Sequence, residues 1–236
     1  MALVKSPLGG IAASGSVAGV TFARNRAGQY ARAWAKPVNP ATVRQTEVRS
    51  AFGVSSVGWG VLDQSGVDSW DAYAQQFIRL NRLGEEYTPK GRQMFMEINQ
   101  NLSIIGQPQI AEPSALTDNP SMIDIGTIVG TETGGTLDAL TIANIKYELP
   151  SSGDGYAVID ATPPLDAKLT NVNNLYRQLA VAAGPQPIAL TDVEAAYIAV
   201  FGSAALAGQI INFRVRVVDE ISGLGSSYLK AAIVLS

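Results

Sequence analysis

The side chains that most often perform chemistry near neutral pH are missing from this sequence, because its 236 residues include no histidine and no cysteine. The ordinary pKa of histidine lies closest to neutrality, so its absence removes Ser–His–Asp and Cys–His catalytic arrangements. Zinc sites built from cysteine and histidine are excluded as well, and so are disulfides. Carboxylates, lysine and tyrosine are left as possible catalysts, and oxygen atoms as possible metal ligands.

The remaining candidate catalytic residues do not form a recognisable site. Ser227 and Lys230 have the spacing of a serine-enzyme motif that requires a helix, but they fall in a predicted strand, where such positions point to opposite faces. Asp63, Asp68 and Asp71 surround a predicted helix start and lack calcium-loop spacing. We therefore predict no enzymatic activity, no cofactor and no metal. Catalysis by a pair of carboxylates stays open as an alternative.

Charge is unevenly distributed along the chain. Residues 1–50 carry seven basic side chains and one acidic one, a net charge of +6, whereas residues 51–236 carry ten basic and nineteen acidic side chains, a net charge of −9. The basic residues are spaced through a patterned segment rather than gathered in a tail, which favours an acidic protein surface over nucleic acid as the partner. Only 16% of the residues are charged, so the folded surface is either covered in part by other subunits or rich in uncharged polar residues.

Residues 1–40 are expected to form an extended arm with a β-hairpin. Two β-like runs, Val17–Arg24 and Gln29–Lys36, flank Asn25–Gly28, whose glycine can adopt the positive φ that hairpin loops often need. Large residues alternate with small ones, so we expect a ribbon with one packing face, which needs a surface to lie on because an isolated hairpin is marginally stable. The expected assembly or anchoring residues are Val17, Val20, Phe22, Arg24, Arg26, Tyr30, Arg32 and Trp34.

Residues 41–106 are predicted to be helical. Capping boxes at Thr42 and Ser65 and a start at Thr88–Pro89 indicate three helices, and Gly106 is expected to end the last one. Each helix has a mostly apolar stripe at helical spacing. The stripes are Val48, Phe52, Ser55, Trp59 and Leu62 in the first helix, Trp70, Tyr73, Ala74 and Phe77 in the second, and Phe95, Ile98, Leu102 and Ile105 in the third.

A proline-rich linker, residues 107–121, is expected to precede a β domain at residues 122–236. A capping box at Thr191 indicates one inserted helix, and six short strands separated by turn residues predict an immunoglobulin- or fibronectin-like antiparallel β-sandwich. The whole chain is thus predicted to be α+β. The expected strands are Ile123–Val129, Ala139–Leu149, Tyr156–Thr162, Leu175–Ala183, Ile210–Val218 (in which Phe213, Val215 and Val217 face the core) and Tyr228–Leu235.

Several short motifs are distinctive as a set. They lie at Ser6–Gly10, Ser14–Phe22, Arg24–Arg32, Pro37–Gln45, Trp70–Tyr73, Gly91–Asn99 and Ala161–Pro164. This set resembles a family of uncharacterised proteins encoded by tailed bacteriophages and prophages. Similar sequences often have proline where this chain has Val43. The family has no assigned activity that the resemblance could carry over to this chain. Its setting among phage structural genes implies a virion component assembled in the host cytoplasm.

We therefore expect a virion protein, most nearly an accessory capsid protein of the cement, decoration or spike kind. Its N-terminal half would bind the major capsid protein or other virion proteins, and residues 122–236 would be displayed. Its helical segment would connect these two parts or mediate self-association into a homo-oligomer. A neck or tail component is one alternative. Another is a module that binds a cell-surface glycan through Tyr156, Tyr176, Tyr197 or Tyr228. We expect neither a signal peptide nor a membrane span.

Overall fold

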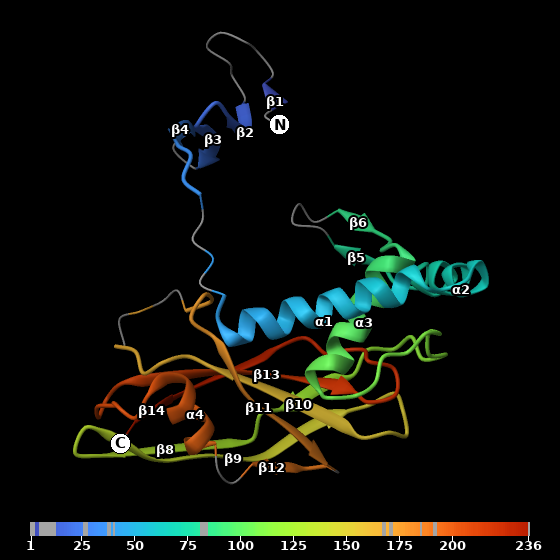
Figure 1. Cartoon of the computed structure of the whole chain (residues 1–236). Helices are drawn as coiled ribbons and strands as arrows, with labels where there is room; N and C mark the ends of the chain where they lie inside the picture. The colour runs from blue at the N-terminus through green and yellow to red at the C-terminus, as the bar shows by residue number, and fades with distance from the viewer. Residues whose placement is uncertain are drawn as a thin grey trace. The chain divides into compact units, whose positions relative to one another are not determined.

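The computed structural model describes residues 3–4, 13–25, 28–36, 39, 41–80, 85–166, 169, 172–184, 186–190 and 193–235. These residues form a mixed α+β structure with four helices and several antiparallel sheets, which confirms the predicted class (Figure 1). The chain divides into two compact units, Met1–Thr46 (unit 1) and Glu47–Ser236 (unit 2).

Unit 1 contains a four-stranded antiparallel sheet in the order β1–β2–β3–β4. The strands are β1 (Leu3–Val4), β2 (Ala13–Val17), β3 (Val20–Asn25) and β4 (Gly28–Ala33). The predicted hairpin is confirmed, because β3 and β4 pair with each other. The predicted run Val17–Arg24 was wrong in one respect. A tight turn at Ala18 and Gly19, both with positive φ, interrupts it and joins β2 to β3.

The three helices predicted between residues 41 and 106 are present. They are α1 (Val43–Gly60), α2 (Gln64–Ala74) and α3 (Gly91–Ile104). The start of α2 differs from the prediction, because the carboxylate of Asp63, rather than Ser65, caps the helix by accepting a hydrogen bond from the N–H of Gly66 at 2.8 Å. Gly106 follows α3 with a φ of 76°, the left-handed conformation in which helices often end, as predicted.

The predicted stripes of α2 and α3 are buried, but the stripe of α1 is only partly so. Ser55 is buried and Trp59 is half-buried, whereas Val48 and Phe52 are 49% and 56% exposed. The reason lies in the packing, since α1 meets α3 through its C-terminal half. There Trp59 lies edge-on to Phe95 with ring centres 5.4 Å apart. The first half of α1 therefore presents apolar side chains at the surface.

A short β-ribbon between α2 and α3 was not predicted. It consists of β5 (Arg79–Leu80) and β6 (Glu86–Tyr87), each of two residues. An ion pair of 2.6 Å between Arg79 and Glu97 fastens the ribbon to α3. Strands this short carry no alternation that could predict them from sequence.

The strands expected in the C-terminal half are present, with small shifts in their ends. They are β7 (Ser121–Asp124), β8 (Thr127–Thr133), β9 (Thr136–Glu148), β10 (Gly155–Ala161), β11 (Arg177–Gly184), β13 (Ile210–Asp219) and β14 (Leu229–Val234). One further strand, β12 (Ile188–Leu190), was not predicted. The run Ile123–Val129 is split into β7 and β8 at Gly126, whose φ is 82° and where a Cβ would collide with the carbonyl of Ala143. The inserted helix is α4 (Glu194–Phe201), and its expected cap, Thr191, lies outside the described residues.

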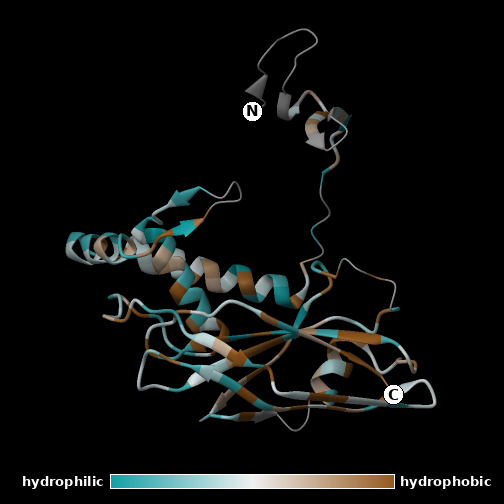
Figure 2. Cartoon of the chain, turned by 180° about the vertical axis from the view of Figure 1, so that it is seen from behind, coloured by the Kyte–Doolittle hydropathy of each residue, from teal (hydrophilic) through white to brown (hydrophobic). Residues whose placement is uncertain are grey.

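These strands form two antiparallel sheets on either side of a hydrophobic core. One sheet has the order β11–β10–β13–β14, and the other has the order β12–β9–β7 with β8 also paired to β9. Phe213, Val215 and Val217 of β13 are fully buried between the sheets, as their alternation predicted. Along the strands of unit 2 in Figure 2, hydrophobic segments (brown) occur together with hydrophilic ones (teal).

The helical segment shares a second core with the opposite face of the first sheet. Val158 of β10 and Val218 of β13 lie in one apolar cluster with residues of α2 and α3, so these helices cover that face (Figure 1). The stretch 107–121, expected to be a linker, is fastened to the helices. Its carbonyl oxygens accept hydrogen bonds of 2.7 Å from Trp70 and Tyr73. The chain divides between residues 46 and 47 instead.

Candidate assembly surfaces

The predicted anchoring residues lie in a sheet with two different faces. Phe22 pairs with Ala31, and the next residue, Ala23, pairs with Tyr30. Paired residues share a face of a sheet, and neighbours along a strand alternate between faces. Phe22 therefore lies with Val20 on one face, and Tyr30 lies on the other. The prediction of one packing face is wrong, because the hairpin register separates these two groups.

None of the unit 1 residues whose side chains are described is buried. Phe22 is half-buried, Arg32 is exposed, and Tyr30 and Trp34 are 43% and 54% exposed. A sheet gains stability mainly by burying a face against another layer. The described side chains of this sheet therefore form no buried face within unit 1.

Unit 1 is basic throughout. It contains six basic residues and no acidic residue, whereas all twenty acidic residues of the chain lie in unit 2. All charged side chains of unit 1 are therefore positive. Among the predicted anchoring cations, the backbone of Arg24 lies in β3, and Arg26 lies outside the described residues. Val17, the remaining predicted anchor, lies at the end of β2.

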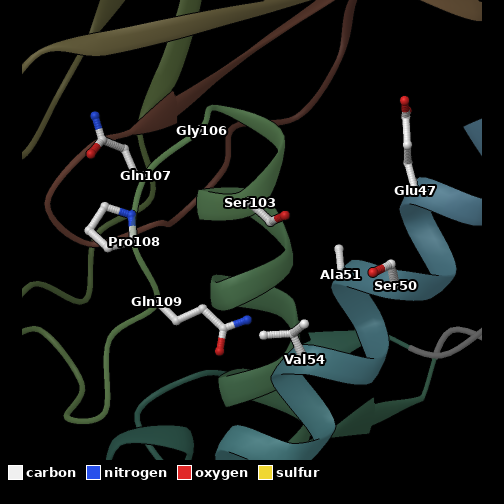
Figure 3. A pocket seen from close by; sticks show the side chains of 9 residues that line it. All are labelled: Glu47, Ser50, Ala51, Val54, Ser103, Gly106, Gln107, Pro108 and Gln109. Atoms are coloured by element: carbon white, nitrogen blue, oxygen red, sulfur yellow. The ribbon is translucent and has the colours of Figure 1, made fainter.

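A second exposed surface lies along α1, of whose 18 residues only Ser55 is buried. Beside it is an open groove of about 560 Å³ between α1 and the end of α3 (Figure 3). In Figure 3, Val54 and Gln109 point toward one another across the groove. Apolar and polar residues both line it, with Ala51, Val54 and Pro108 beside Ser50, Ser103 and Gln107, so its walls offer apolar contact together with hydrogen-bonding groups.

The tyrosines considered for glycan binding are mostly packing residues. Tyr197 is fully buried, Tyr176 is 7% exposed, and the half-buried hydroxyl of Tyr156 accepts a hydrogen bond of 2.9 Å from Gln107. Tyr228 alone among the four is largely accessible, with 41% of its surface exposed.

Tyr228 belongs to a cluster that holds an arginine on the outer face of the sheet β11–β10–β13–β14. The guanidinium carbon of Arg214 lies 4.5 Å from the ring centre of Tyr228 and 4.6 Å from that of Tyr176. Its Nε donates a hydrogen bond of 2.8 Å to the buried carboxylate of Asp160. Cation–π contacts and this ion pair fix Arg214 in place, so the cluster joins β10 and β13 to the segment before β14.

A fully buried carboxylate, Asp219, also has a structural role. It accepts hydrogen bonds of 2.6 Å from the hydroxyls of Ser151 and Ser222 and one of 3.2 Å from the N–H of Ile221. These donors satisfy the carboxylate and organise the turn after β13.

Buried tyrosine hydroxyls in unit 2 act as hydrogen-bond donors. Those of Tyr73 and Tyr147 donate to carbonyl oxygens at 2.7 Å, and that of Tyr197 does so at 2.9 Å. Burial raises the pKa of Tyr73 to about 12, with the negative charge of Asp219 as a second cause, and burial also raises the pKa values of Tyr147 and Tyr197. All three hydroxyls therefore stay protonated at neutral pH.

The remaining candidates for chemistry are Ser227, Lys230 and groups of carboxylates. Ser227 and Lys230 are both exposed, and Lys230 lies 3.4 Å from the side-chain oxygen of Asn173. Within the described ranges, no three carboxylates lie close enough together to hold a metal ion. In the same ranges no helix is both long enough and apolar enough to cross a membrane.

Comparison of the chain with protein-family models, characterised proteins and solved structures gives no match. Its function is therefore inferred from its own residues and from the motifs that extend through its N-terminal half.

Proposed function

We propose that this chain is a non-enzymatic structural protein of a tailed-bacteriophage virion, most nearly an accessory capsid protein of the cement, decoration or spike kind. Unit 1 anchors it to the particle, and the β-strand region of unit 2 is displayed. The observation that carries the anchoring role is the sheet of unit 1, in which no residue with a described side chain is buried. Such a sheet is stabilised by a partner surface.

The charge of unit 1 defines the chemistry of that partner. Six basic residues without any acidic residue favour a surface rich in carboxylates. The apolar face with Val20 and Phe22 and the face with Tyr30 allow the sheet to contact protein on both sides. The proposed partner is the major capsid protein or another abundant virion protein.

The displayed region is proposed to be an immunoglobulin-like sandwich. Two antiparallel sheets with one core between them support this assignment, and α4 would be an insertion in the usual architecture. An experimental structure of unit 2 tests it through the strand connections. Helices α2 and α3, which cover the outer face of one sheet, would then be a second addition.

The anchoring role is tested by adding purified chains back to particles made without this protein. The full-length chain is expected to co-sediment with the particles at a fixed stoichiometry, and a chain of residues 41–236 is expected to stay in the supernatant. The matched variants are Phe22→Ala in unit 1 and Val234→Ala, the latter at an apolar residue of β14 that is 61% exposed. Undiminished binding by the shortened chain would sink the proposal.

Copy number separates the shell from the neck or tail. Quantitative mass spectrometry of purified particles is expected to find hundreds of copies for a shell protein, and six or twelve for a neck component.

Glycan binding is a second candidate function, and the exposure of Tyr228 beside Arg214 favours it. Aromatic rings can stack on sugars, and the ion pair with Asp160 holds the neighbouring guanidinium in a fixed position. Binding of the full-length chain to immobilised host-surface polysaccharide tests the idea. Tyr228→Ala is expected to abolish binding, and Tyr87→Ala, a tyrosine of similar exposure on β6, is the control. Equal retention of both variants would reject a site at Tyr228.

A further inference from the structure

The exposed side of α1 carries valines at a spacing typical of helix pairing. Val54, Val57 and Val61, the last just beyond the helix, continue a series that begins with Glu47 and Ser50. Intervals of three and four residues place all five on one stripe, as in a coiled-coil seam. The three valines are 57%, 68% and 78% exposed. Unit 2 therefore exposes an apolar helical stripe at its surface.

The glycines of α1 distinguish an inner side from an outer side. A Cβ at Gly58 would lie 3.1 Å from Gln109 and 3.4 Å from the ring of Phe95, so close packing of α1 on α3 accounts for this glycine. Gly53 and Gly60 have nothing within 4 Å of such a Cβ. A glycine inside a helix destabilises it by roughly 1 kcal/mol relative to alanine. At Gly53 and Gly60, no close contact within the described chain offsets this destabilisation.

We propose that a second copy of this chain packs its α1 antiparallel against this stripe and forms a two-fold symmetric dimer. Centred on Val54, the antiparallel arrangement places Val57 opposite the partner's Ala51, next to the partner's Ser50, and Val61 opposite the partner's Glu47. Gly53 and Gly60 flank the seam and let the two backbones approach closely. A parallel arrangement would instead place two Glu47 carboxylates side by side, which costs free energy.

The available area is consistent with a second copy as the occupant. A half-exposed valine offers on the order of 100 Å², so the stripes and groove walls of two copies together bury on the order of 1,000 Å². That value lies at the lower limit for specific interfaces, so the dimer is expected to dissociate in the micromolar range. The groove of about 560 Å³ beside Val54 gives the partner helix a second wall, formed by Ser103 and residues 106–109 (Figure 3).

The first experiment is sedimentation equilibrium of the purified full-length chain over a range from about 1 to 200 μM, chosen to span that dissociation constant. The unaltered chain is expected to associate to a dimer, and Val57→Glu is expected to weaken association at least tenfold. Val200→Glu is the matched control, because Val200 is a helical valine that is 44% exposed on α4. Circular dichroism at the lowest concentration checks that each variant is folded. A chain that is monomeric throughout, or equal effects of the two variants, would overturn the proposal.

Gly53→Ala gives a second readout that a merely unstable variant cannot imitate. Alanine is expected to favour the folded monomer about fivefold because it is the better helix former, yet to weaken the dimer about tenfold because its methyl group separates the backbones. Gly58→Ala is the control, since it disturbs packing on Phe95 instead. A Gly53→Ala chain that dimerises as tightly as the unaltered chain would contradict close approach at this position.

The dimer does not depend on the virion role, and a shortened chain separates the two. Residues 41–236 retain α1 and are expected to dimerise with unchanged affinity while failing to bind particles. Loss of association in this chain would show that unit 1, rather than α1, mediates the contact between copies, and the proposal would be wrong. Failure of particle binding by the full-length chain would leave the dimer intact and reject only the virion role.

Discussion

Each unit of this chain contains a four-stranded antiparallel sheet, and the two sheets differ in what covers them. The sheet β11–β10–β13–β14 is buried on one face by the second sheet, where Phe213 lies, and on the other by α2 and α3, which contact Val158 and Val218. In the sheet of unit 1, no residue with a described side chain is buried. Local alternation and tight turns are enough to define strands, but burial is what stabilises a sheet.

The difference follows from what stands between the large residues of each sheet. In β13, Phe213, Val215 and Val217 point to one side with arginines between them, and Val158 and Val218 add apolar area on the other. In β3 and β4 the residues between the large ones are mostly alanines, which bury little area on either face. Unit 1 is therefore suited to contributing half of an interface rather than a core.

The largest loss of stability is expected when a core phenylalanine of unit 2 is removed. Phe213→Ala is expected to lower the free energy of unfolding of unit 2 by about 3–5 kcal/mol, because it opens a cavity at a fully buried position. Phe22→Ala is the counterpart in unit 1, and it is expected to leave unit 2 unfolding within about 0.5 kcal/mol of the unaltered chain. Urea unfolding monitored by tryptophan fluorescence measures both. Equal destabilisation by the two variants would remove the distinction between the units.

A smaller effect is expected at the buried carboxylate of unit 2. Asp219→Ala is expected to cost about 2–3 kcal/mol, because it leaves the hydroxyls of Ser151 and Ser222 without their acceptor in a buried place. Asp154→Ala, at an exposed position before β10, is the control and is expected to change little. Thermal unfolding of both variants compares them, and a stable Asp219→Ala chain would mean that water replaces the carboxylate.

Local patterns predicted the elements of unit 2 well. The alternation around Phe213 correctly identified both β13 and its buried face. The stripes that include Trp70 and Phe95 correctly identified the buried sides of α2 and α3, respectively. The glycine stop at Gly106 was also correct. These features depend on residues close in sequence, which is why the sequence alone was sufficient.

Relations between distant residues could not be predicted in this way. The shared core of α3 with Val158 and Val218 depends on which face of a sheet the helices cover, and no local pattern specifies that choice. The same limit applies to unit 1, where the register of β3 and β4 decides that Phe22 and Tyr30 lie on opposite faces. The exposure of Val48 and Phe52 on α1 was likewise unexpected, because an apolar stripe does not state which part of it packs against a neighbour.

The buried tyrosines of unit 2 are expected to make its stability depend on pH in the alkaline range. The pKa of Tyr73 is raised from 10.0 to about 12 by burial, so the folded state favours its protonated form. Its contribution to stability is therefore complete below pH 10 and is lost as the pH rises from 10 toward 12. Tyr73→Phe is expected to cost about 1 kcal/mol at pH 8, through the lost hydrogen bond to Leu116, and to flatten the alkaline loss of stability. Urea unfolding from pH 8 to 11 measures both effects, and parallel profiles would contradict this assignment.

The smallest change in the stability of unit 2 is expected when residues 1–40 are removed. Both hydrophobic clusters of unit 2 are built from residues at or beyond Trp59, so removing residues 1–40 takes away no core side chain. The free energy of unfolding of residues 41–236 is expected to lie within about 0.5 kcal/mol of the full-length value. Removal of residues 229–236 is the matched control. It deletes β14 and uncovers β13 at the edge of its sheet, so it is expected to unfold unit 2. If the first deletion destabilised unit 2 as the second does, unit 1 would be a structural part of unit 2. Its uncovered sheet would then be no argument for a partner.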